Sequence, residues 1–263
     1  MKKFTTTVSA AALVALTAPA GMAASILIDD FTTGDQTVED LPDTFPNASS
    51  VLAVDAIGGN RDMSVLTSNQ FNPEGPGDTS LSVDTTEIAP SPASGMIQGV
   101  LSFDNVGGSL GNGLIVYDGN GTQGDLDIDG LGGVDFTMGG DLDRFFFDVV
   151  RADNVFDITV RVYGDTASGS GVSTFVENID PDAPGGFDPF LRFTEFDTGA
   201  DLTNFENVGA LSFEITSVDP AVDGALASIS VVPLPASALL LLGGLGGFAG
   251  LSAANRRRRR KEA

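Results

Sequence analysis

The 263-residue chain contains no cysteine, no histidine and no tryptophan, and its only lysines are Lys2, Lys3 and Lys261. These absences exclude catalysis by a thiolate, by a Ser–His pair or by a zinc ion held by histidine or cysteine. Schiff-base chemistry is likewise excluded from the lysine-free centre of the chain. Carboxylates are so frequent that no particular pair is indicated as a glycoside-cleaving site. We therefore expect a protein that is not an enzyme and that requires no cofactor.

Positive charge is scarce in the centre of the chain. Residues 24–232 hold five arginines against 35 aspartates and glutamates, which gives a net charge of −30. Such a charge repels nucleic-acid phosphates, so we expect no nucleic-acid partner. Two interpretations of the acidity remain open. One is a surface adapted to a saline extracellular setting, and the other is a domain with dedicated calcium sites.

The first 23 residues have the layout of a secretory signal peptide. Lys2 and Lys3 precede an apolar stretch from Val8 to Ala18, and the small residues Gly21-Met22-Ala23 follow at the expected cleavage position. We therefore expect the rest of the chain to be exported. The absence of disulfides is compatible with export, because a domain of about 200 residues is large enough to bury a substantial core.

The C-terminus holds an uncharged run of 19 residues, 236–254, and then a block of basic residues. A helix over this run is about 28 Å long at roughly 1.5 Å per residue, close to the thickness of a bilayer's hydrocarbon core. We expect a transmembrane helix there, with the basic block on the cytoplasmic side. The arginines of that block are Arg256, Arg257, Arg258, Arg259 and Arg260.

A short motif stands directly before the apolar run. Its residues are Val232, Pro233, Leu234, Pro235 and Ala236. Motif, apolar run and arginine block together resemble the PEP-CTERM sorting signals, in the variant named for Val-Pro-Leu-Pro-Ala. The resemblance implies a Gram-negative host, recognition by the membrane peptidase exosortase, a transient stay in the inner membrane, and release to the cell surface or extracellular matrix. It divides the chain into a signal peptide (1–23), an acidic domain (24–231) and a sorting signal (232–263).

Short apolar runs separated by Gly, Asn, Asp and Pro clusters fill the acidic domain. Most repeat every two residues, as Phe156, Ile158, Val160 and Val162 do, which predicts half-buried strands. The predicted strands cover residues 25–31, 50–57, 79–85, 96–103, 113–118, 143–152, 156–164, 171–178, 189–196, 209–218 and 225–232. One short helical turn is expected within 200–209. The pattern predicts an all-β fold, an antiparallel β-sandwich of jelly-roll form. The stretches 26–31 and 210–232 also resemble the first and last strands of galactose-binding-like jelly rolls of carbohydrate modules.

One segment has the spacing of a calcium loop. The candidate ligands are Asp118, Asn120, Asp125, Asp127 and Asp129. The last three, followed by Gly130, match the first half of the pattern D-x-D-x-D-G. The twelfth position is Phe136, where an EF-hand has a bidentate glutamate. The alternative is a strand whose wet face carries the three alternating aspartates.

A second calcium candidate depends on the topology. If the first and last strands pair, Asp29 and Asp30 are expected to meet Asp219 or Asp223. Carboxylate oxygens are the ligands that calcium prefers, so such a cluster would form a cation site at the junction of the two strands.

The sequence leaves two functions open. One is a non-enzymatic surface or matrix protein that is a structural or adhesive part of a biofilm. The other is a calcium-assisted carbohydrate-binding module that holds exopolysaccharide, with Tyr117 or Tyr163 lining a sugar groove. Exposed aromatic rings on a concave sheet face beside a cation site would favour the second function, and purely polar, acidic faces the first. The rings of Phe145–Phe147 are expected to serve packing.

Overall fold

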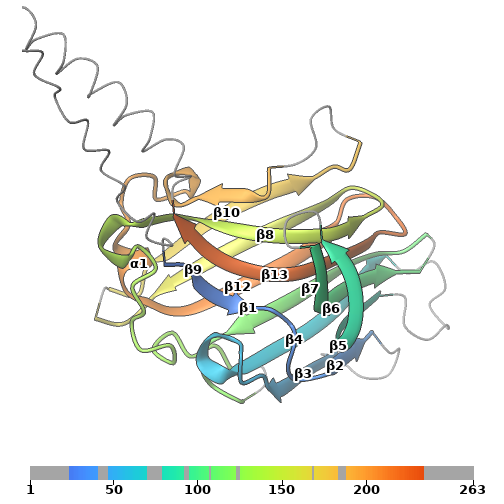
Figure 1. The fold of residues 1–263 in the computed structure, drawn as a ribbon, viewed down its shortest axis with the longest axis horizontal. Coiled ribbons are helices and arrows are strands. Elements are labelled where there is room, and N and C mark those ends of the chain that lie inside the picture. The colour runs from blue at the N-terminus through green and yellow to red at the C-terminus, as the bar shows by residue number, and fades with distance from the viewer. Residues whose placement is uncertain are drawn as a thin grey trace, which may run out of the picture.

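The computed structural model describes residues 24–40, 47–69, 79–91, 95–106, 108–122, 125–167, 169–182 and 188–233. These segments form a sandwich of two antiparallel β-sheets (Figure 1). The expected signal peptide, and the expected sorting signal from Leu234 onward, lie outside the described residues. Within the described part, no helix is long and apolar enough to cross a membrane.

The seven-stranded sheet has the order β11-β8-β13-β6-β5-β2, with β1 added beside β13. Its strands are β1 (Ile26–Asp29), β2 (Gln36–Glu39), β5 (Thr79–Ser91), β6 (Gly95–Asn105), β8 (Leu142–Ala152), β11 (Phe190–Arg192) and β13 (Asp223–Pro233). The last two residues of β13, Val232 and Pro233, also begin the expected sorting motif, and they lie opposite Arg144 and Leu142 of β8.

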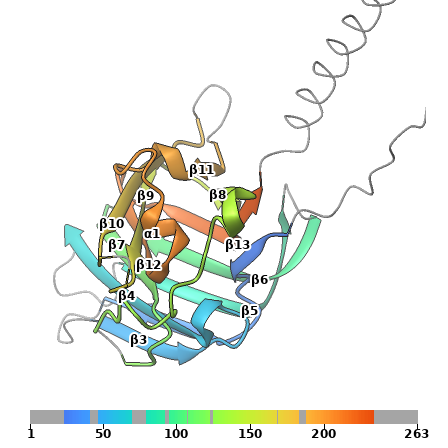
Figure 2. The ribbon, with the colours of Figure 1, turned by 90° about the vertical axis from the view of Figure 1, so that its left-hand side faces the viewer.

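The six-stranded sheet has the order β10-β9-β12-β7-β4-β3. Its strands are β3 (Asn47–Leu52), β4 (Asn60–Asn69), β7 (Leu110–Tyr117), β9 (Phe156–Gly164), β10 (Val172–Ile179) and β12 (Val208–Ser217). The chain crosses between the sheets at β4–β5, β6–β7, β8–β9 and β12–β13, among others, which is the connectivity of a jelly roll. Figure 2 shows the two sheets as two layers. The prediction of an all-β jelly-roll sandwich is confirmed.

Among the described residues, helical structure is confined to short turns. The expected turn within 200–209 is α1 (Thr203–Glu206). Three further turns are of the 3₁₀ type: η1 (Ile57–Gly59), η2 (Met138–Gly140) and η3 (Phe193–Glu195). The run 50–57 was expected to be a strand throughout, but β3 ends at Leu52 and the chain turns into η1.

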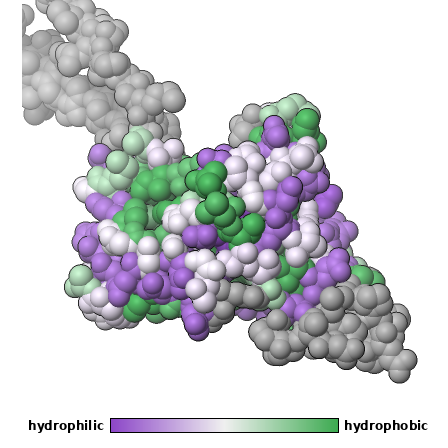
Figure 3. All heavy atoms as spheres, turned by 90° about the horizontal axis from the view of Figure 1, so that it is seen from below, coloured by the Kyte–Doolittle hydropathy of each residue, from purple (hydrophilic) through white to green (hydrophobic). Residues whose placement is uncertain are grey.

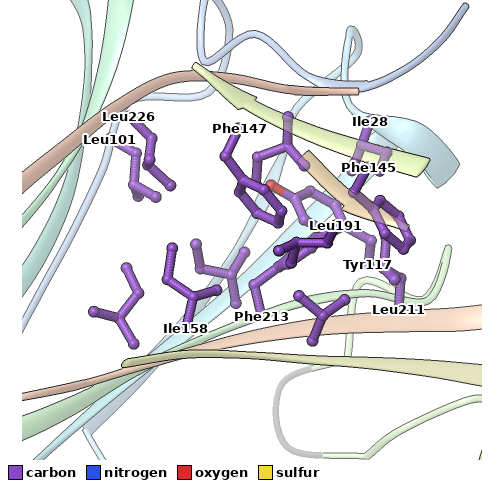
Figure 4. Packing of buried hydrophobic residues seen from close by; sticks show 14 of the residues in the cluster. Ile28, Leu101, Tyr117, Phe145, Phe147, Ile158, Leu191, Leu211, Phe213 and Leu226 are labelled. Atoms are coloured by element: carbon purple, nitrogen blue, oxygen red, sulfur yellow. The ribbon is translucent and has the colours of Figure 1, made fainter. Parts of the chain in front are cut away.

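The core lies between the two sheets, as the two-residue period predicts. Phe145 and Phe147 of β8 point into it and meet Phe213 of β12 edge-on, with ring centres 6.2 and 5.5 Å apart (Figure 4). Edge-on aromatic pairs of this kind stabilise beyond the area that they bury. Phe146 points to the opposite side of β8, where its ring packs against Phe190 at 5.1 Å. The expectation that these rings serve packing is confirmed.

The first and last strands pair, which is the condition for the second calcium candidate. Ile26 and Leu27 of β1 lie opposite Val231 and Ser230 of β13, and a bulge precedes Asp29. β6 occupies the same side of β13 further along, over residues 223–226. Asp29 therefore lies opposite Ile229, six residues along β13 from Asp223.

Asp29 is the centre of a buried polar network. Its side chain is 1% exposed, and its carboxylate accepts hydrogen bonds from the Arg61 guanidinium and the Tyr117 hydroxyl, each at 2.8 Å. The Phe31 amide donates a third bond, and Gln36 accepts one from Arg61. Burial raises the pKa of the Asp29 carboxyl, and the Arg61 guanidinium opposes this effect. The network ties β1 to β2, β4 and β7 through the core.

The second calcium candidate is therefore wrong. Asp29 is satisfied by Arg61, and Asp30 accepts hydrogen bonds from the amide and hydroxyl of Thr32. Asp223 lies on β13 opposite Asp104 of β6, in the part of the strand that does not pair with β1. The first and last strands do pair, but their register keeps Asp29 away from Asp223.

The surface combines acidic and apolar areas. Seen from below, apolar residues gather in the middle of the face, and hydrophilic residues surround them (Figure 3).

Candidate functional site

A groove of about 290 Å³ lies against the outer face of the six-stranded sheet. Five strands and the loop after β7 contribute to it. The lining residues are Ala48 of β3; Asp62, Met63 and Ser64 of β4; Leu114 and Val116 of β7; Arg161 and Tyr163 of β9; Ser212 and Glu214 of β12; and Asp125 and Leu126 of the loop. Its volume is near the lower end of the range typical for small-molecule sites.

The strand register explains why these side chains meet. Residues directly opposite each other on neighbouring strands project from the same face of a sheet. Asp62 lies opposite Val116, which lies opposite Ser212, which in turn lies opposite Arg161. This row crosses β4, β7, β12 and β9 at about 4.8 Å per strand. The groove thus runs across the strands.

Two buried polar atoms of the groove lack a hydrogen-bond partner among the described residues: Asp62 Oδ1 and Ser212 Oγ. Their residues are 9% and 3% exposed. Buried polar atoms are paired in the great majority of cases, and an unpaired one costs about 1–3 kcal/mol. Both atoms belong to residues that line the groove, and their hydrogen-bonding capacity is unused within the described residues.

Asp62 has an unfavourable electrostatic environment. Burial raises the pKa of its carboxyl above the ordinary value, and the nearby Asp118 carboxylate adds to the rise. A hydrogen bond with Ser50 opposes both effects. A donor or a cation placed against Asp62 Oδ1 would stabilise the ionised form.

The arginine of the groove is already engaged. Arg161 forms an ion pair with Glu214 at 2.8 Å, and the Asn112 amide donates a hydrogen bond of 3.2 Å to the other Glu214 oxygen. Both oxygens of Glu214 are thus used within the sheet. The uncompensated negative charges of the groove are therefore those of its aspartates, Asp62 and Asp125.

Apolar groups form much of the remaining lining. Tyr163 is half-buried, and Leu126, which is 43% exposed, projects from the loop after β7. Leu114 and Val116 provide apolar floor between the polar residues. Tyr117, the other tyrosine considered for a sugar groove, is fully buried in the core network instead. Of the two expected candidates, the structure brings only Tyr163 to the groove.

The expected calcium ligands lie in the loop that borders the groove, where backbone amides occupy their carboxylates. Asp118 accepts hydrogen bonds from the Asn120 and Asp127 amides, each at 2.9 Å, and Asp127 accepts one from the Asp129 amide at 3.0 Å. Asp129 accepts two from Thr166. Asp125 lines the groove instead.

Residues 125–131 run through irregular chain and turns, so the alternative prediction of a strand is wrong. In the part of the chain that the structure describes, no three or more acidic residues are grouped as metal ligands. The D-x-D-x-D-G spacing produces consecutive loop-capping hydrogen bonds in this fold, which is the usual local role of aspartate in turns.

The loop is pressed closely onto the sheet. A Cβ at Gly130 would overlap the carbonyl oxygen of Asp118, and one at Gly209 of β12 would overlap that of Ile128. The Leu131 amide donates a hydrogen bond of 2.9 Å to the Gly209 carbonyl. These two glycines hold the wall of the groove in place.

A second acidic cluster lies outside the groove. Asp104 and Asp223 are opposite each other on β6 and β13, and Asp153 caps the Asp223 amide at 2.6 Å. Burial, followed by the Asp223 carboxylate, raises the pKa of Asp104 to about 6, against the effect of Arg151. The raised pKa favours protonation of Asp104 as the solution becomes mildly acidic.

The remaining residues that were expected to be functional are only partly among those that the structure describes. Val232 and Pro233 belong to β13, whereas Leu234, Pro235, Ala236 and the arginine block at 256–260 lie outside the described residues. The most informative groove residues, Asp62 and Ser212, were not expected from the sequence. Alternation could have placed Ser212 outward on its predicted strand, but the strand that carries Asp62 was not predicted.

No known protein family and no curated protein matches the chain. Among solved structures, the family 11 carbohydrate-binding module of the cellulosomal cellulase Lic26A-Cel5E of Clostridium thermocellum has a TM-score of 0.36 and 12% identity, and the match covers 77% of this chain and 96% of that chain. The solution structure of CtCBM11 has a TM-score of 0.35 and 13% identity, with 77% and 97% of the two chains covered.

Proposed function

We propose that the groove on the six-stranded sheet binds a polysaccharide segment and does not cleave it. The observation that supports this most strongly is the pair of buried, unpartnered polar atoms, Asp62 Oδ1 and Ser212 Oγ, in a lining that is otherwise largely apolar. A sugar chain presents apolar ring faces together with a rim of hydroxyls. The ring of Tyr163 can pack against a ring face, while hydroxyls satisfy the two polar atoms.

Binding measurements on the purified full-length protein test this proposal. A glycan screen followed by calorimetry should identify a saccharide that binds, and Tyr163→Ala should weaken its binding about tenfold. Val176→Ala is the matched control, since Val176 is an exposed side chain of the edge strand β10 and does not line the groove. An absence of saccharide binding, or equal losses in the two variants, would contradict the proposal.

We further propose that the chain is exported, sorted by an exosortase and retained at the cell surface or in the extracellular matrix, where the groove holds exopolysaccharide of a biofilm. The support is the sequence from Val232 to Ala236 with the apolar run and arginine block behind it. Intact-mass analysis of the surface form from the native host should show a chain that ends near Ala236. Recovery of that form with Arg256–Arg260 still attached would refute processing.

A further inference from the structure

We infer that the groove selects polysaccharides that carry protonated amino groups, with Asp62 as the residue that binds the ammonium. This inference rests on the proposed function, because it specifies which saccharides the groove takes. Asp62 lines the groove and is 9% exposed. Its Oδ1 atom has no hydrogen-bond partner among the described residues. A buried carboxylate oxygen in this condition favours a charged donor over a neutral hydroxyl, because hydrogen bonds between ionised groups are about twice as strong.

The charges around Asp62 point to a cationic ligand. Three carboxylates line the groove, and its one cation, Arg161, is paired with Glu214. Asp118 adds a further negative charge near Asp62 and contributes to the raised pKa of its carboxyl. An anionic polysaccharide would meet this uncompensated charge and the net charge of −30 on the domain. A protonated amine would instead compensate it.

An ammonium fits the position better than a divalent metal ion. Calcium takes six to eight oxygen ligands, as a general rule, whereas an ammonium has three donors and needs a single strong acceptor. The described residues form no group of three or more acidic side chains suited to a metal ion. Asp62 Oδ1 offers one buried acceptor, and the ligand's other donors can face neighbouring hydroxyls.

The second unpartnered atom sets the geometry of the ligand. Ser212 lies two strands from Asp62 in the same row, about 10 Å away at the usual strand spacing. One sugar amine cannot reach both atoms, so Asp62 and Ser212 contact different units of one chain. The ligand is therefore an extended amino-sugar polymer crossing the strands, rather than a monosaccharide.

The test compares two oligosaccharides that differ only in their amino groups. Calorimetry with the full-length protein measures its affinity for β-1,4-linked glucosamine oligomers and for N-acetylated oligomers of the same length. The assay is run at a pH where the amines are protonated and the carboxyls of the protein are ionised. The parent should bind the amine form at least tenfold more tightly. Asp62→Asn, which keeps the size of the side chain, should abolish this preference. Asp55→Asn removes an equal charge in an exposed turn outside the groove and should retain it.

A pH series on the parent provides the same information without a mutation. The preference for the amine form should fall as acid neutralises Asp62 while the amines of the ligand stay charged. The role of Asp62 can therefore be tested even if Asp62→Asn fails to fold. Equal affinity for the two oligomers would overturn the selection of amines but leave saccharide binding intact. A preference that survives Asp62→Asn would overturn the assignment to Asp62. Equal losses of the preference in Asp62→Asn and Asp55→Asn would show that it arises from the overall negative charge of the protein and not from Asp62. Failure of every saccharide to bind would overturn the proposed function itself.

Discussion

Arg61 is the largest side chain that the sandwich buries completely. Its guanidinium is held by Asp29, by Gln36 and by the backbone carbonyls of Thr33 and Gly34. A buried ion pair contributes little compared with a well-packed apolar pair, but removing one partner leaves an uncompensated charge. Arg61 therefore contributes to stability mainly by compensating the charge of the buried Asp29.

Arg61→Met should lower the free energy of unfolding by about 3–5 kcal/mol, since Asp29 would remain buried without its counter-charge. Urea unfolding monitored by circular dichroism measures the loss. Arg192→Met is the control, because the Arg192–Glu195 pair is exposed and spans 3.7 Å. The control should change stability by less than about 1 kcal/mol. Equal effects of the two substitutions would argue against the structural role of the buried network.

Asp104 should make the protein more stable in mild acid. Its pKa is about 6 in the folded state, against about 3.9 for an unfolded aspartate. The folded state therefore keeps a proton that the unfolded state has lost. The resulting contribution is complete below the unfolded pKa and disappears as the pH rises through about 6. Asp104→Asn removes the repulsion with Asp223. Its melting temperature should exceed that of the parent above this range, and the difference should shrink on acidification. A constant difference across the range would show that Asp104 is not the titrating group.

Among the elements, the loop after β7 has the tightest constraints. It borders the groove and is pinned to β12 by the Leu131–Gly209 hydrogen bond and by a bridge between Val134 and Val208. A side chain at Gly209 cannot be accommodated unless the loop moves. A substitution at Gly209 should therefore alter the groove by displacing the backbone of this loop.

Gly209→Ala should destabilise the domain by about 1–3 kcal/mol, as overpacking does, and should weaken saccharide binding as the loop is displaced. Gly121→Ala serves as control, because a Cβ there would meet only Asn60 at 3.4 Å or more. Thermal melting and calorimetry of both variants provide the comparison. Unchanged binding in a destabilised Gly209→Ala protein would show that the loop does not shape the groove.

Calcium should act on this loop only as a counter-ion. The carboxylates of Asp118, Asp127 and Asp129 already accept amide hydrogen bonds. We expect calcium and magnesium at matched ionic strength to raise the melting temperature equally, in the parent and in Asp127→Asn. Specific binding would instead add stabilisation that grows with calcium concentration. A calcium surplus that vanishes in Asp127→Asn would establish a site after all.

Local pattern predicted most strands and the sandwich class, but not which strands become neighbours. β9 was predicted with its observed bounds, because its inward residues are apolar and its outward residues polar. β4 was missed because its inward row begins with a buried arginine, Arg61, and includes Thr67, which leaves only Met63 and Val65 as apolar inward residues. The groove depends on β4, β7, β12 and β9 becoming neighbours, and these strands are far apart in the chain. Pairing over such distances is decided by the whole core rather than by any short window.

At the scale of the molecule, charge is the dominant feature. Each of the five arginines of the described domain forms an ion pair, namely with Asp29, Asp143, Asp104, Glu214 or Glu195. Local pairing therefore leaves no arginine of the domain without an acidic neighbour. The remaining carboxylates repel one another in the compact state, and only ions from solution can screen them.

Sodium chloride should consequently raise the melting temperature up to about 1 M, where the Debye length falls to about 3 Å. Differential scanning calorimetry over a salt series measures the trend. The effect should be smaller at a pH near the acidic isoelectric point, where fewer carboxylates are ionised. A melting temperature independent of salt would contradict strong self-repulsion.

The position of β13 determines when the fold can be completed. This strand is the last in the described chain, yet it lies inside its sheet, bonded to β8 on one side and to β6 and β1 on the other. A ribosome delivers residues in order, so β13 can join β8, β6 and β1 only after all the other strands of the described chain have been synthesised. Closure of the seven-stranded sheet therefore waits for the last strand of the described chain, and the long-range pairings of that strand are slow to form.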